Sequence, residues 1–137
     1  MDGEVIVASV REPSTVYGVH GSDGASYWKC FARGSVLHSD LEAWEYAALP
    51  AGSVSGEHEH SRTDEVYFIL TGEGEMSLNG QRRRVVPGDA ILTPLGARHG
   101  LVNTGEGVLS WLTIEMTHPA TIDLLPDWSP VGIAAEE

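Results

Sequence analysis

Short apolar runs, separated by glycines, prolines and polar clusters, make up most of this 137-residue chain. Several runs alternate between apolar and polar positions with a period of two, which is typical of β-strands, whereas helical periodicity is scarce. Sixteen glycines and seven prolines mark the turns between the runs. The pattern predicts an all-β sandwich or barrel with at most one short helix, near residues 122–125. The expected strands cover residues 4–9, 26–31, 42–49, 65–71, 75–78, 81–86, 90–93, 100–103 and 108–116.

A two-residue hairpin is predicted at Asn79-Gly80, because both residues tolerate positive φ and stand between two expected strands. The strand that follows carries the only basic run of the chain. Arg82 and Arg84 share one face of that strand, where we expect them to offset the acidic surface or to pair with acids across strands.

The strand expected over residues 65–71 is apolar on both faces. Positions 65, 67 and 69 share one face and positions 66, 68 and 70 the other, and Glu65 is the exception to their apolar character. A strand that is buried on both faces needs a second layer outside the barrel. A partner subunit is the simplest such layer, which predicts a homodimer, and a flap formed by residues 1–40 is the alternative.

The charge of the chain limits its partners. It has 20 acidic and 8 basic residues and a net charge of −12 at pH 7. Such a surface repels nucleic acids and anionic membranes, so neither is an expected partner. No window approaches the roughly 18 apolar residues of a transmembrane helix, and the N-terminus lacks the features of a signal peptide. Cys30 is the only cysteine, which excludes an intrachain disulfide and favours a reducing, cytoplasmic location.

The segment GEHEHSRTDE, residues 56–65, places two histidines two positions apart. Residues two apart in an extended chain point the same way, so His58 and His60 can hold one cation together. Glu65 follows after a four-residue turn, and His99 begins another expected strand. Three imidazoles and one carboxylate suit a divalent transition metal such as Fe, Mn, Ni, Cu or Zn. The other three histidines, His20, His38 and His118, are expected to be ordinary surface residues.

Two longer patterns contain these four residues. Residues 52–72 fit the pattern G-x5-H-x-H-x4-E-x6-G at every fixed position, and residues 88–103 fit G-x5-P-x-G-x2-H-x3-N equally fully. These are the signature motifs of the cupin family, and the chain closely resembles a single-domain cupin. The resemblance implies a double-stranded β-helix (jelly-roll) barrel, with residues 1–137 as one domain and residues 118–137 as its C-terminal tail. It also implies the metal ligands His58, His60, Glu65 and His99, and the structural positions Gly52, Gly72, Gly88, Pro94, Gly96 and Asn103.

Two further residues are candidates for a catalytic role. Tyr67 shares the face of Glu65, so we expect it beside the metal, where it either donates a hydrogen bond or proton to a substrate or packs in the core. Arg98 adjoins His99 and would serve as a clamp for a substrate carboxylate. Alternation on a regular strand, however, turns Arg98 outward into solvent.

The aromatic residues before and after the motifs are either core or pocket wall. Trp44 and Tyr46 share one face of their strand and Glu45 lies on the opposite face. We expect Trp44 and Tyr46 to point inward and, with a slight preference, to belong to the core. Trp111, on the last long strand, has the same two alternatives.

Charge counting gives a first indication of the substrate. Two positive charges on the ion and one negative charge on Glu65 leave about +1, which favours an anionic or chelating molecule. The first hypothesis is a metal-dependent enzyme for a small organic molecule, through oxygen chemistry (dioxygenase or oxidase) or Lewis-acid chemistry (isomerase, lyase, cyclisation or decarboxylation). The second is a non-catalytic module that binds or senses a metabolite. The intact ligand set favours the enzyme, because simple binding does not require an ion with open coordination positions.

Overall fold

The computed structural model describes residues 7–21, 24–33, 40–59 and 62–117. In this part of the chain no helix is both long enough and apolar enough to cross a membrane. Within the described residues, one 3-10 turn, η1 (Val19–Gly21), accompanies the β-strands. The strands are β1 (Ser14–Tyr17), β2 (Ala25–Arg33), β3 (Leu41–Leu49), β4 (Val54–Glu59), β5 (Thr63–Thr71), β6 (Gly74–Leu78), β7 (Gln81–Val85), β8 (Ala90–Thr93), β9 (Arg98–Asn103) and β10 (Leu109–Thr117).

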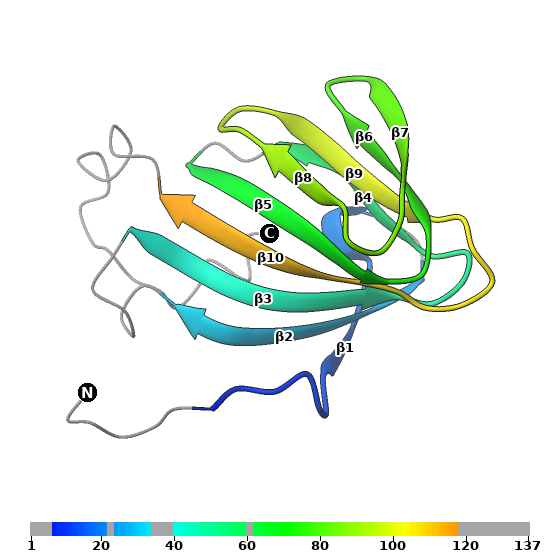
Figure 1. Cartoon of the computed structure of the whole chain (residues 1–137), viewed down its shortest axis with the longest axis horizontal. Coiled ribbons are helices and arrows are strands. Elements are labelled where there is room, and N and C mark those ends of the chain that lie inside the picture. Colours follow the sequence, from blue (N-terminus) through cyan, green and yellow to red (C-terminus); the bar gives the residue numbers. More distant parts are fainter. Residues whose placement is uncertain (1–6, 22–23, 34–39, 60–61, 118–137) are drawn as a thin grey trace.

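The strands form two sheets with antiparallel pairing throughout (Figure 1). The larger sheet has the order β1-β2-β3-β10-β5-β8, and the smaller sheet has the order β4-β9-β6-β7. Successive strands such as β3, β4 and β5 fall alternately in the two sheets, so the chain crosses repeatedly from one layer to the other. This arrangement confirms the predicted all-β jelly-roll fold.

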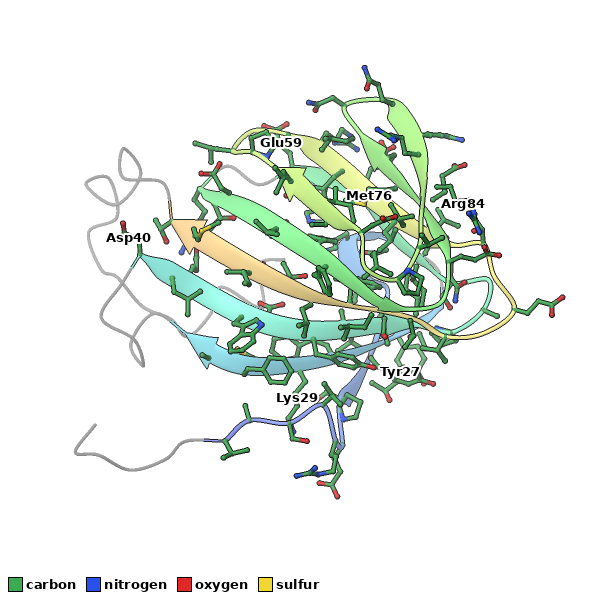
Figure 2. All side chains as sticks on the ribbon, in the orientation of Figure 1. Tyr27, Lys29, Asp40, Glu59, Met76 and Arg84 are labelled. Carbon is green, nitrogen blue, oxygen red and sulfur yellow. The ribbon has the colours of Figure 1, made fainter. Side chains whose placement is uncertain are left out.

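The apolar core lies between the two sheets. Alternation along β5 and β10 directs one face of the larger sheet inward, and apolar residues of β6 and β9 meet it from the smaller sheet. Figure 2 shows Met76 of β6 within the interior. The buried cluster comprises Leu49, Tyr67, Ile69, Met76, Val85, Leu101, Leu109 and Trp111.

Some strand predictions differ from the structure. Residues 7–9 form no strand, while β1 and β4 were not predicted as strands. Both have few apolar residues: β1 reads STVY and is mostly exposed, and β4 reads VSGEHE. Their extended conformation follows from pairing with β2 and β9 rather than from their own hydrophobic pattern. The predicted helix near residues 122–125 lies outside the described residues.

The predicted hairpin is confirmed. Asn79 and Gly80 have φ values of 50° and 83°, and β6 and β7 pair on either side of them. The basic run on β7 is exposed, as expected, and its arginines pair with acids of β6 and the preceding turn. Arg82 lies 3.8 Å from Glu75, and Arg84, which projects from the surface in Figure 2, lies 2.6 Å from Glu73.

Two structural positions of the motifs fix the turns around the strands. Gly72 has a φ of 80°, and a Cβ at this position would lie 2.4 Å from the carbonyl oxygen of Val108. Asn103 donates hydrogen bonds from its side-chain amide to the carbonyls of Leu49, at 2.9 Å, and Gly107, at 2.8 Å. These two residues therefore hold the turns that join β5 to β6 and β9 to β10 against their neighbours.

Candidate metal centre and pocket

Three of the four predicted metal ligands converge between the sheets. His58 lies on β4, Glu65 on β5 and His99 on β9, and one ligand atom from each lies within 4.8 Å of the other two. Glu65 and His99 are buried, and His58 is half-buried. The fourth predicted ligand, His60, lies outside the described residues. The structure thus brings together side chains from both motifs, and their role as ligands stays a prediction.

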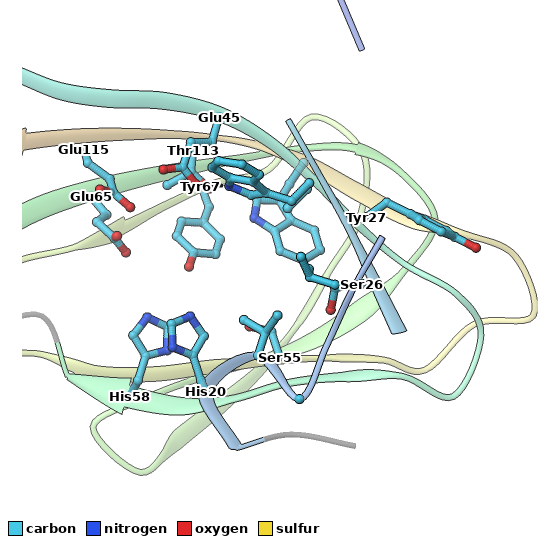
Figure 3. A pocket seen from close by; sticks show the side chains of 16 residues that line it. His20, Ser26, Tyr27, Glu45, Ser55, His58, Glu65, Tyr67, Thr113 and Glu115 are labelled. Atoms are coloured by element: carbon cyan, nitrogen blue, oxygen red, sulfur yellow. Dashed lines mark hydrogen bonds between the residues drawn. The ribbon is translucent and has the colours of Figure 1, made fainter. Parts of the chain in front are cut away.

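The strand pairing explains this convergence. β4 and β9 pair so that His58 stands directly opposite His99, after a register shift between Ser55 and His58. Their rings meet edge to face, with centroids 4.3 Å apart. Glu65 comes from the larger sheet and faces these two histidines across the interior. Figure 3 shows the carboxylate of Glu65 pointing from its sheet toward His58 on the opposite side of the pocket.

Hydrogen bonds orient the histidine rings. The Nδ1 atom of His58 lies 3.2 Å from the carbonyl oxygen of Gly56. A carbonyl can only accept, so this contact requires the proton on Nδ1 and leaves Nε2 of the neutral ring as the metal-binding atom. The Nε2 atom of His99 lies 3.1 Å from both Tyr67 Oη and Glu65 Oε2. The Nε2 atom of His99 therefore faces the carboxylate of Glu65.

The donor set fits a divalent transition metal ion. Imidazole nitrogens with one carboxylate oxygen suit ions of this class. Two ligands at right angles, each about 2.1 Å from one ion, lie roughly 3 Å apart. The 3.1 Å between Glu65 Oε2 and His99 Nε2 is close to that value. The described residues therefore form three parts of a plausible coordination sphere.

The candidate ligands open onto a cavity of about 540 Å³, which is large enough for a small organic molecule. The larger sheet supplies most of its wall, and η1 closes one side. Among the described residues that line it, none is an arginine or a lysine. These residues are Val16, Gly18, Val19, His20, Ser26, Tyr27, Trp28, Glu45, Ala47, Ser55, His58, Glu65, Tyr67, Trp111, Thr113 and Glu115.

The two predicted catalytic residues lie in different places. Tyr67 is buried, lines the cavity and directs its hydroxyl to His99. Arg98 is absent from the lining, and its guanidinium Nε lies 3.4 Å from Glu57 Oε2 on the outer side of β9 and β4. Strand alternation therefore turns Arg98 away from the cavity while it turns His99 inward. The structure does not bring Arg98 into the candidate site.

His20 lines the cavity, so its expected role as an ordinary surface histidine is wrong. Its ring stacks on that of His58, with centroids 3.5 Å apart and planes 8° apart. The backbone of His20 is left-handed, with φ 54° and ψ 33°. No hydrophobic period or motif marks this short turn, so the sequence offers no signal for the contact. His38 and His118 lie outside the described residues.

The inward faces of β3 and β10 carry acids that sequence reasoning missed. The expectation that Trp44 points inward is wrong: its side chain is 40% exposed, while its neighbour Glu45 is 6% exposed and lines the cavity. On β10, Trp111 belongs to the core cluster and also lines the cavity, so both of its alternatives hold. Alternation then places Thr113 and Glu115 in the lining as well. Alternation from Trp111 was therefore a usable signal for Glu115.

Comparison with known proteins agrees with the fold and the site. The family model described as "Cupin domain" matches residues 45–115. An oxalate-binding protein of Thermotoga maritima is 30% identical over 112 residues, which cover 82% of this chain and 93% of that protein. The dimethylsulfoniopropionate lyase DddQ of Ruegeria pomeroyi is 35% identical over 83 residues, which cover 58% of this chain but 41% of that protein. The crystal structure of a predicted oxalate decarboxylase from Thermotoga maritima superposes with a TM-score of 0.78 and 28% identity, covering 82% of this chain and 99% of the other.

Proposed function

The chain belongs to the cupin family, and on this premise we propose that it is a metal-dependent enzyme for a small organic molecule. The proposed ligands of one divalent transition metal ion are His58, His60, Glu65 and His99. The observation that carries the proposal is the convergence of His58, Glu65 and His99 within 4.8 Å at the end of a cavity. A bound ion of this class supplies a Lewis acid or a redox centre.

Tyr67 is the proposed catalytic residue of the protein itself. Its hydroxyl lies 3.1 Å from His99 Nε2, so it ends beside the candidate ligands. Stacking on Trp111, with ring planes 9° apart, fixes the orientation of its ring. From this place the hydroxyl can donate a hydrogen bond or a proton to a substrate atom next to the ligands. We exclude Arg98 from the proposal because its side chain pairs with Glu57 outside the cavity.

Two branches of chemistry remain, and the names of relatives favour one. Oxalate and dimethylsulfoniopropionate, which appear in those names, are small organic carboxylates. One of the names is that of a lyase. A lyase reaction uses a metal ion as a Lewis acid, without oxygen as a co-substrate. We therefore place Lewis-acid chemistry on a small carboxylate, of the lyase or isomerase type, ahead of dioxygenase or oxidase chemistry.

A non-catalytic binding module is the second candidate. It is favoured by the name of the Thermotoga maritima relative, which refers to oxalate binding. In such a module the ion and Tyr67 would hold a metabolite without transforming it.

Elemental analysis of protein purified without chelators, followed by a substrate screen under air and under nitrogen, tests the enzyme proposal. We expect close to one ion per chain and turnover that persists under nitrogen. Tyr67→Phe should keep the metal and lower kcat by about a hundredfold, within the usual range for a general acid or base. A metal content far below one ion per chain would refute the enzyme, and full metal with ligand binding but no turnover would favour the binding module.

We also propose a homodimer formed through the outer face of the larger sheet. Strand register aligns exposed or half-buried uncharged residues there in two rows. The described residues of β1 and β2 extend this sheet at its edge instead of covering the face. Rows without charged residues suit contact between two copies that each carry a net charge of −12. The rows are Trp44, Ile114, Val66 and Leu92, and Tyr46, Leu112, Phe68 and Ala90.

Sedimentation or light scattering of two matched variants tests the dimer. Phe68 is 43% exposed on the proposed interface, and Val108 is 46% exposed in the turn between β9 and β10. Phe68→Glu should therefore shift the protein to a monomer, whereas Val108→Glu should leave the mass unchanged. A monomeric parent protein would contradict the proposal.

The domain and its location are further proposals. Residues 1–137 would form one cupin domain that acts in the cytoplasm on a small molecule, without nucleic acid or membrane partners. The support is the single cysteine and the strongly acidic charge. Fractionation of cells that produce the protein, with detection in the soluble fraction, is the matching measurement.

A further inference from the structure

Three carboxylates line the cavity, and they change the charge count made from the ligands alone. Glu45 is 6% exposed, and Glu65 and Glu115 are each 2% exposed. With an ion of charge +2 and all three carboxylates ionised, the cavity carries about −1 instead of +1. No arginine or lysine is among the described residues that line the cavity. The cavity away from the ion therefore disfavours a second negative charge on a bound molecule.

One part of the wall combines a carboxylate with aromatic rings. Trp28 donates a hydrogen bond from its indole Nε1 to Glu45 Oε2, at 2.6 Å. Trp111 stacks on Tyr67, with centroids 5.9 Å apart, and both line the same cavity as Trp28. We call Trp28, Glu45 and Trp111 the indole–carboxylate wall. Electron-rich indole faces and a fixed carboxylate attract cations, and the attraction increases where water is excluded.

Strand register separates this wall from the candidate metal ligands. Glu45 of β3 stands opposite Thr113 of β10, which stands opposite Tyr67 of β5. The Cα atoms of Glu45 and Tyr67 are thus two strand spacings apart, roughly 10 Å. Figure 3 shows both side chains extending from this sheet, with Glu65 nearer to His58. A molecule of a few carbon atoms can therefore contact the ligands at one end and the wall at the other.

We propose that the indole–carboxylate wall binds a positively charged ammonium group of the substrate. The substrate is then a small zwitterion, with a carboxylate directed to the metal ligands and an ammonium group, primary or quaternary, held by Trp28, Glu45 and Trp111. The carboxylate end rests on the proposed metal-dependent function. The ammonium end rests on the wall alone, so the two parts are separable by experiment.

Tetramethylammonium tests the wall without any metal. In nuclear magnetic resonance titrations of the metal-free protein, it should shift the indole signal of Trp28 saturably and leave that of the exposed Trp44 unchanged. Trp28→Phe assigns the signal. The neutral isostere tert-butanol should bind at least about tenfold more weakly, and Glu45→Gln should weaken tetramethylammonium binding about fivefold or more. Equal effects of the two probes, or no saturable shift, would overturn the proposal.

Two isosteric carboxylates test the whole zwitterion in the Zn²⁺-loaded protein. Calorimetry should give a dissociation constant at least about tenfold lower for 3-(trimethylammonio)propanoate than for 4,4-dimethylpentanoate, which differs by one charge. Glu45→Gln should remove most of this difference and keep the full zinc content, because Glu45 is not a proposed ligand. The exposed Glu57→Gln serves as the matched control and should keep the difference. Equal or tighter binding of 4,4-dimethylpentanoate contradicts the proposal.

The two proposals fail in different ways. If zinc binds at one ion per chain and tetramethylammonium does not bind, the cation site is wrong and the metal-dependent function stands. If tetramethylammonium binds and no metal does, the wall stands and the metal-dependent function is wrong.

Discussion

The two ends of the cavity differ in where along the chain they come from. The metal end is built from His58, Glu65 and His99, which belong to two segments with fixed spacing between residues 52 and 103. The opposite wall is built from Trp28, Glu45 and Trp111, which lie on strands before and after those segments. Fixed spacing is needed where several atoms must reach one ion. A wall that binds one group of a substrate has no such constraint. On the two proposals above, the motifs therefore set the chemistry and the flanking strands set the substrate.

Removal of a candidate ligand at the metal end should have the largest effect, which is a loss of affinity for the metal ion. His99→Ala deletes an imidazole that is 1% exposed and lies 3.1 Å from Glu65. Residues that merely support a ligand contribute about ten- to a hundredfold to metal affinity, so loss of the ligand itself should exceed a hundredfold. A chelator competition titration measures this. Tyr67→Phe, which removes only a contact to His99, is the control and should lower the affinity by no more than about a hundredfold. A His99→Ala variant that binds metal as tightly as the parent protein would contradict the assignment of His99 as a ligand.

The second prediction compares two glycines of the motifs that both have positive φ but differ in the space around them. Gly72→Ala and Gly88→Ala both place a side chain at positive φ, which costs about 1–2 kcal/mol. A Cβ at Gly72 also meets the Val108 carbonyl oxygen at 2.4 Å, whereas nothing lies within 4 Å of a Cβ at Gly88. We expect Gly72→Ala to lower the free energy of unfolding by roughly 1–3 kcal/mol more than Gly88→Ala, as for other overpacked sites.

Urea unfolding of the two glycine variants gives the comparison. If Gly72→Ala does not fold, the result agrees with the prediction, provided that Gly88→Ala folds. Equal stability of the two variants would show that the turn after β5 shifts freely, which the close approach of its backbone to β10 argues against.

The sequence predicted the metal end far better than the opposite wall, for physical reasons. The fold and the meeting of His58, Glu65 and His99 follow from two motifs that encode their own turns through glycine, proline and Asn103. The sequence predicts that Trp44 points inward because apolar side chains usually do, but the outer face of the larger sheet also carries apolar residues. Where both faces of a strand carry apolar residues, the alternation of polar and apolar positions no longer shows which face points inward. The inward position of Glu45 was therefore not predictable.

His20 was unpredictable for another reason. Its contact with His58 depends on a left-handed turn and on the packing of η1 beside β4, neither of which has a sequence pattern. The third prediction uses this stack to test how the flanking segment supports the metal end. His20→Ala should weaken metal binding roughly three- to tenfold, the usual effect of one aromatic contact. His20→Phe keeps a flat ring and should stay within about twofold in the same chelator titration.

The result for the phenylalanine variant is decisive. If His20→Phe is as weak as His20→Ala, the ring nitrogens of His20 matter and the flanking segment belongs to the metal end. If neither variant changes the affinity, the stack has no role in orienting His58.

The smallest effect is expected at Arg98, where sequence proximity to the metal end is misleading. Arg98 adjoins His99, yet its side chain is 58% exposed and pairs with a Glu57 side chain that is 46% exposed. Such a pair contributes at most about 1 kcal/mol, because solvent screens it and two long side chains lose freedom. Arg98→Ala should therefore change the unfolding free energy by less than about 1 kcal/mol and leave the metal content intact. In the calorimetric titration with 3-(trimethylammonio)propanoate, the Arg98→Ala variant should have the same dissociation constant as the parent protein. A rise of more than about tenfold in that constant would mean that Arg98 leaves Glu57 and enters the cavity when a carboxylate binds.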